Sequence, residues 1–245
     1  MAVVADSLAN TASGLIVSEA EMALNTRQLD NRSGQIQSAG NLVVRATDSA
    51  DNTGGLLRAG QALTVDTASL ANANTLGADQ GIEGNALAVS ANTIDNRSGA
   101  LRANTALAIN SSGALNNSGG LITSAQHVAI RDAAATKTLA VDNTAGTIAA
   151  GEQLDIDAAS LSGGQLLSHR DLAIDLGGKL DNTGEITANR NARINVGGTL
   201  DNSGTLQAGT TLAVTAGSLD NRASGEILAH DLKLAATDTH TLTNR

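Results

Sequence analysis

The sequence predicts an all-β protein, a right-handed parallel β-helix of about 11 coils with three short strands in each coil of about 21 residues. A phrase of the form Leu-Asp-Asn-x-x-Gly recurs along the chain, and each copy is followed by two further short apolar stations. The 245 residues include no Phe, Tyr, Trp, Pro or Cys, although 41% are hydrophobic. These observations indicate short strands and turns around a core of small aliphatic side chains.

The recurring phrase supplies the first strand and the turn of each coil. Clear copies are Leu29-Asp30-Asn31 and Leu200-Asp201-Asn202. The twelve copies start at Leu8, Leu29, Ala50, Leu70, Ile94, Leu115, Val141, Leu161, Leu180, Leu200, Leu219 and Leu242. A spacing of about 21 residues is typical of solenoid proteins, in which each repeat is one coil.

The other two strands of each coil are marked by an Ile or Leu near its middle and by an apolar-x-apolar pair five or six residues later. Ile122 followed by Val128 and Ile130 is one example. Because residues i and i+2 lie on the same face of a strand, both members of the pair point to one side. No helical period accompanies these strands, so each should pair in parallel with its counterpart one coil away, at about 4.8 Å. Parallel crossovers are overwhelmingly right-handed.

An asparagine stands two places after the start of eleven of the twelve copies, and Gly163 takes its place in the other. In a strand this residue points inward with the apolar residue that precedes it by two. An amide both donates and accepts, so stacked amides can pass hydrogen bonds from coil to coil. We expect a structural ladder, rather than a polar binding track, at Asn10, Asn31, Asn52, Asn72, Asn96, Asn117, Asn143, Asn182, Asn202, Asn221 and Asn244.

Composition excludes several functions. A net charge of −9 and the lack of aromatic residues argue against a nucleic-acid partner, which needs a basic face or stacking platforms. The chain has no long apolar run, so we expect no membrane insertion. Its first residues lack the basic and apolar regions of a secretory signal.

The chain is expected to form one β-helical segment over 1–245, an excerpt of a longer protein, since the repeat is under way at Leu8 and the twelfth copy is cut short at Arg245. Coils 70–93 and 115–140 are longer than the rest, with extra residues at 75–79 and 133–138. Extra residues in a solenoid form loops, which can bind partners or simply be tolerated. Exposed terminal coils also invite end-to-end self-association.

The natural enzymatic alternative is a β-helical polysaccharide-degrading enzyme, which would need catalytic carboxylates. Alignment of the coils stacks Arg131, Asp157, Asp175 and Asn195 in one outward column. Neighbouring outward acids are about 4.8 Å apart in any such fold, so this spacing is not specific for catalysis. Arg131 should neutralise the column, and no aromatic side chain is present to hold a sugar. We therefore expect no enzymatic activity, no catalytic residue and no cofactor.

A metal site is not expected either. Asp181, Asp201 and Asp220 stack as like charges, with Arg222 nearby to offset their repulsion, but a calcium-binding Gly-Gly-x-Gly-x-Asp nonapeptide is missing. The histidines do not align as a set of zinc ligands, which must converge within about 2.1 Å of one ion. They are His127, His169, His230 and His240.

Two phrases resemble the haemagglutinin repeats of filamentous haemagglutinin-type exoproteins: Leu29-Asp-Asn-Arg-Ser-Gly-Gln-Ile-Gln-Ser-Ala-Gly-Asn-Leu42 and Leu200-Asp-Asn-Ser-Gly-Thr-Leu-Gln-Ala-Gly-Thr-Thr-Leu212. These are the secreted partners of bacterial two-partner secretion systems. The resemblance covers the chain from about Leu8 to its end. Contact-dependent growth-inhibition effectors share the repeat, so the repeat alone does not separate an adhesin from a toxin stalk.

The resemblance implies a right-handed β-helical shaft that is secreted through an outer-membrane two-partner secretion transporter and displayed at the bacterial cell surface. It implies a structural role, in which the shaft holds adhesive or effector parts away from the cell. Contact with a host cell or a neighbouring bacterium would then be made through other regions of the protein.

Overall fold

The structure is a computed structural model that describes residues 1–237 and 241–244. In these residues it contains no helix and 23 strands, which belong to a single sheet. The strands are β1 (Ala2–Ala9), β2 (Leu15–Ser18), β3 (Met22–Asp30), β4 (Gln35–Ser38), β5 (Leu42–Asp51), β6 (Leu56–Ala59), β7 (Ala62–Ala71), β8 (Gly81–Asp95), β9 (Ala100–Asn116), β10 (Leu121–Ser124), β11 (His127–Asp132), β12 (Ala140–Asp142), β13 (Thr147–Ala150), β14 (Gln153–Ala158), β15 (Ser160–Ser162), β16 (Gln165–Ser168), β17 (Asp171–Leu176), β18 (Leu180–Asn182), β19 (Glu185–Ala188), β20 (Asn191–Asn202), β21 (Thr205–Asn221), β22 (Glu226–Ala236) and β23 (Leu242–Asn244).

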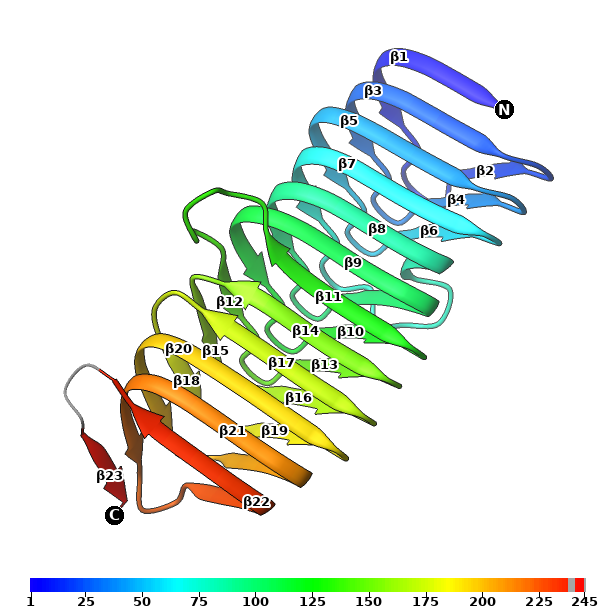
Figure 1. The fold of residues 1–245 in the computed structure, drawn as a ribbon. Helices are drawn as coiled ribbons and strands as arrows, with labels where there is room; N and C mark the ends of the chain where they lie inside the picture. Colours follow the sequence, from blue (N-terminus) through cyan, green and yellow to red (C-terminus); the bar gives the residue numbers. More distant parts are fainter. Residues whose placement is uncertain (238–240, 245) are drawn as a thin grey trace.

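The strands wind into a right-handed parallel β-helix of about twelve turns, with the two termini at opposite ends (Figure 1). Each strand pairs in parallel with its counterpart in the next coil, as β10 does with β13 and β11 with β14. The predicted fold class is therefore confirmed. The strand boundaries vary along the rod: β10, β11 and β12 are separate, whereas β9 runs through all three stations of its coil without a break.

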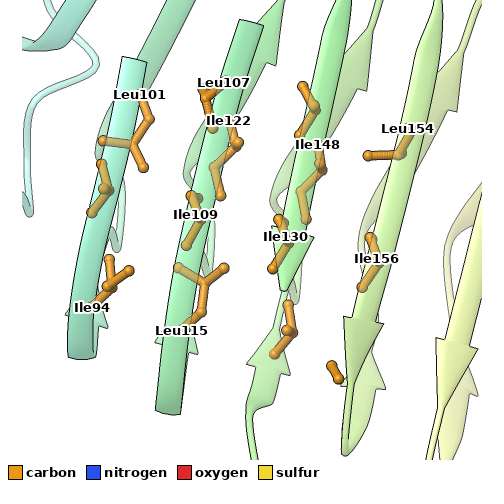
Figure 2. Packing of buried hydrophobic residues seen from close by; sticks show 14 of the residues in the cluster. Ile94, Leu101, Leu107, Ile109, Leu115, Ile122, Ile130, Ile148, Leu154 and Ile156 are labelled. Carbon is orange, nitrogen blue, oxygen red and sulfur yellow. The ribbon is translucent and has the colours of Figure 1, made fainter. Parts of the chain in front are cut away.

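The core is a set of columns in which each inward side chain stacks on a similar one in the next coil. Ile109 pairs in register with Ile130, and Ile130 pairs with Ile156. A second column joins Leu101, Ile122 and Ile148 (Figure 2). All of these side chains are at most 2% exposed. A large ring in one coil would require room in the coils on either side, which explains why small and branched aliphatic residues fill this narrow interior.

Outward positions alternate with the inward ones along every regular strand. In β10 the burial pattern changes residue by residue, with Ile122 fully buried and its neighbour Thr123 partly exposed. The outward residues therefore cover the faces of the rod, and the inward ones fix its register. The described part of the chain contains no helix that could cross a bilayer.

Replacing Ile122 with Ala should lower the free energy of unfolding by about 2–5 kcal/mol, because it opens a cavity between Leu101 and Ile148. Urea unfolding followed by circular dichroism measures the change. The control is Thr123→Ala on the outward face of the same strand, for which about 0.5 kcal/mol or less is expected. Equal losses for the two variants would contradict the inward column.

Candidate functional site

The asparagines of the repeat lie in one column at the edge of the rod where each coil turns. From Asn10 to Asn117 and again from Asn182 to Asn221, each side-chain amide donates through Nδ2 to Oδ1 of the asparagine in the next coil. The nine such hydrogen bonds span 2.6–2.8 Å. Asn10 through Asn221 are at most 7% exposed, whereas Asn244 in the last coil is exposed. The column is thus a buried polar track that runs almost the length of the molecule.

Each amide also binds the backbone of its own turn or of the next coil. Asn31 donates from Nδ2 to the carbonyl of Gly34 at 3.3 Å and to the carbonyl of Leu56 at 3.0 Å. Asn52 repeats the pattern with Gly55 and Gly81. A buried amide left without partners costs about 1–3 kcal/mol, so these contacts explain how a polar residue is tolerated in every coil.

The glycine of the repeat is required by the closeness of successive coils. The amide of Gly34 donates to the carbonyl of Asn31 and closes a four-residue turn. A Cβ on Gly34 would lie 1.7 Å from the carbonyl oxygen of Asn10 in the preceding coil. The turn residue before it, Ser33, has a φ of 54°, in the left-handed region. Asparagine and glycine of the repeat therefore act as one unit that turns the chain and links it to its neighbour.

The ladder is interrupted once. At Gly163 no side chain is available, and the column divides into a first ladder from Asn10 to Asn143 and a second ladder from Asn182 to Asn244. The backbone continues across the interruption: the amide of Asn143 donates to the carbonyl of Ser162, and that of Gly163 donates to the carbonyl of Asp181.

The two irregular coils carry loops at the ends of strands. The loop between β7 and β8 is held by arginines from neighbouring coils. Arg102 of β9 donates to the carbonyls of Leu76 and Gln80, and Arg58 of β6 pairs with Asp79. Leu76 is left 46% exposed. In the loop between β11 and β12, the carboxylate of Asp132 accepts hydrogen bonds from three backbone amides, which belong to Ala134, Thr138 and Leu139.

The carboxylates that the sequence placed in one outward column do lie in register, with Arg131 opposite Asp157 and Asp157 opposite Asp175. Arg131 was expected to neutralise them, but the cation that pairs with both is Lys137, from the loop after β11. Its Nζ lies 2.9 Å from Asp157 Oδ1 and 3.1 Å from Asp175 Oδ2. Burial would lower the pKa of Lys137, but the two carboxylates raise it above its usual value. Both acids are therefore engaged in ion pairs rather than set apart as an acid and a nucleophile.

The second acidic column is also paired. Lys179 Nζ lies 3.4 Å from Asp181 and 3.0 Å from Asp201, and Arg222 lies 3.1 Å from Asp201. Burial would raise the pKa of Asp201, but Lys179 and Arg222 lower it below its usual value. The sequence indicated Arg222, but not Lys179, as a cation near this column. Lys179 stands directly before the repeat start at Leu180, and this position could have indicated its role.

The polar outer surface contains recesses between its outward side chains. Two adjoining hollows of about 450 and 420 Å³ share Asp155, Ala173 and Arg193 on the outer face of β14, β17 and β20. His127 lies 3.5 Å from Glu152, and His240 lies outside the described residues. Among the residues that the structure does describe, no three His, Cys, Asp or Glu side chains are grouped to hold a metal ion.

Comparison with known families found one matching model, described as the haemagglutinin repeat. It matches residues 2–54, 37–140, 132–184 and 185–245, which together cover nearly the whole chain. The comparison with curated proteins found no match, and neither did the comparison with solved structures.

Replacing Asn202 with Leu should lower the melting temperature by about 4–12 °C, because Asn182 loses its acceptor and Asn221 its donor. Differential scanning calorimetry measures the shift. Asn195→Leu, an outward position in the same strand, is the control and should change the temperature much less. The inward ladder would be contradicted by similar shifts for the two variants.

Acid should lower the free energy of unfolding partly through protonation of Asp201. A carboxyl whose pKa is lower in the folded than in the unfolded state stabilises the fold above its unfolded pKa of about 3.9, and this stabilisation is lost as the pH falls through the folded value. The urea midpoint of Asp201→Asn should therefore fall less than that of the parent between about pH 4 and pH 2. If the urea midpoints of Asp201→Asn and of the parent fall equally with pH, the ion pairs of Asp201 do not contribute to stability.

Proposed function

The chain belongs to the haemagglutinin-repeat family, and on that premise we propose that it is a shaft segment of a secreted bacterial surface filament of the filamentous haemagglutinin type. In this role it holds adhesive or effector parts of the same protein away from the cell. The repeat family is structural, which agrees with acidic columns that are tied up in ion pairs.

The observation that carries the proposal is the unbroken succession of parallel coils. Each coil pairs through its backbone only with the coil before and the coil after it, as β13 pairs with β10 and β16. The length of such a rod grows by about 4.8 Å for every repeat, and its cross-section stays constant. A rod with this property is suited to hold other parts of a protein at a fixed distance from the cell.

The same architecture supports export before folding. Folding of a solenoid can propagate from coil to coil, and the chain has no cysteine that could form a disulfide before passage through a pore. We propose an outer-membrane two-partner secretion transporter as its partner during export and the bacterial cell surface as its location. Host cells or neighbouring bacteria would be contacted through other parts of the protein, whether an adhesive region or a growth-inhibition toxin.

Deletion of residues 29–218 from the exoprotein that carries this segment removes nine whole repeats and joins positions of equivalent register. The surface filament should shorten by about 43 Å in electron micrographs, and duplication of the same residues should lengthen it by a similar amount. Attachment mediated by other regions should survive the deletion once the protein reaches the surface.

The purified chain 1–245 tests the alternative, in which the segment itself is adhesive. A shaft segment added in excess should leave bacterial attachment to host cells unchanged. If the purified segment blocks attachment, it is itself adhesive and the spacer proposal is wrong. Filaments of unchanged length in the deletion variant would also overturn it.

A further inference from the structure

The coil of residues 161–179, named here the bridging coil, has no asparagine to pass a hydrogen bond between its neighbours. On one side, Asn143 donates from Nδ2 to the carbonyls of Gly146 and Gln165. On the other side, Asn182 accepts at Oδ1 from the amide of Gly184. Both amides thus find partners nearby, but no side-chain hydrogen bond joins the first ladder to the second through the described residues of the bridging coil.

Backbone pairing is also short at this place. In the column of the asparagine turns, β15 and β18 are in register over only two pairs, Leu161 with Leu180 and Ser162 with Asp181. Gly163 and Gly164 follow with φ angles of 67° and 70°, and neither has a side chain that could contact the coils on either side. The bridging coil is therefore held less firmly at this edge than the coils on either side.

Lys137 reaches the bridging coil from one side. It belongs to coil 115–140, and its ammonium group pairs with Asp157 in the next coil and with Asp175 in the bridging coil. It also donates to the backbone carbonyl of Asp175 at 2.9 Å. The aliphatic stem lies against Gly177, where carbons of the lysine are 3.4–3.8 Å from the position a Cβ would take. One side chain from the inserted loop thus fastens three successive coils.

Lys179 does the same from the other side. It belongs to the bridging coil itself, and its ammonium group pairs with Asp181 and Asp201 in the next two coils. Asp201 is only 15% exposed and also pairs with Arg222. Two of the three lysines in the chain therefore flank the interruption of the ladder, and each spans three coils.

We propose that Lys137 and Lys179 form a two-sided clasp that joins the first and second ladders across the bridging coil, and that this coil is a salt-sensitive joint in the rod. An amide–amide hydrogen bond is insensitive to ionic strength, whereas ion pairs at a surface are screened by salt. The bridging coil keeps its backbone pairing through β16 and β17 and its core contacts. In place of an amide ladder it has contacts of the second kind, so opening of the rod should begin there when the clasp is weakened.

Hydrogen exchange measured by mass spectrometry on the whole chain tests the clasp. In the double variant Lys137→Met, Lys179→Met, backbone amides of 161–179 should exchange about tenfold faster than in the parent. Amides of coil 94–114, inside the first ladder, should keep their rates. The parent in 1 M NaCl should show the same local acceleration, which tests the proposal without any substitution.

Arg27→Met is the matched control. Arg27 pairs with Asp6 in one neighbouring coil and with Asp48 in the other, at a place where Asn10, Asn31 and Asn52 are linked without interruption. Its loss should accelerate exchange in its own coils much less than loss of the two lysines does in the bridging coil. If Arg27→Met accelerates exchange as much as the double variant does, the proposal is wrong. It is also wrong if exchange in 161–179 is unchanged both in the double variant and in 1 M NaCl.

Discussion

Every inward residue of this rod must tolerate a neighbour of its own kind one strand spacing above and below it. That constraint selects Leu, Ile and Val, which pack on copies of themselves, as in the column from Ile109 to Ile156. It also selects asparagine at the turn, because an amide donates and accepts at once and so can join a stack without leaving a group unpaired. The lack of aromatic residues follows from the same requirement.

The asparagine ladder has a direction. Each Nδ2 donates toward the C-terminal side, so that successive amides are aligned and polarise one another in a buried setting. The glycine that closes each turn lets the backbones of adjacent coils approach closely enough for these contacts. Turn, ladder and coil spacing are thus consequences of one arrangement, and a rod of constant cross-section results from repeating it.

The columns could be predicted from the sequence because they depend only on spacing along the chain. The period placed Ile122, Ile130 and Asn117 on their faces without any knowledge of three-dimensional contacts. The merging of three stations into one strand in β9 was not predictable, since it depends on how sharply the backbone bends at the corners. Lys137 was missed for a different reason: the path of an inserted loop is not fixed by the repeat, so the sequence favoured Arg131 in the neighbouring strand.

Scalar couplings across hydrogen bonds test the central claim most directly. In protein labelled with ¹⁵N and ¹³C, each inward amide should show a coupling from its Nδ2 to the side-chain carbonyl carbon of the next asparagine. The account predicts a continuous series from Asn10 to Asn143, a second series from Asn182 to Asn244, and no coupling between Asn143 and Asn182. Side-chain amides that exchange freely with solvent and show no such couplings would contradict the stacked interior.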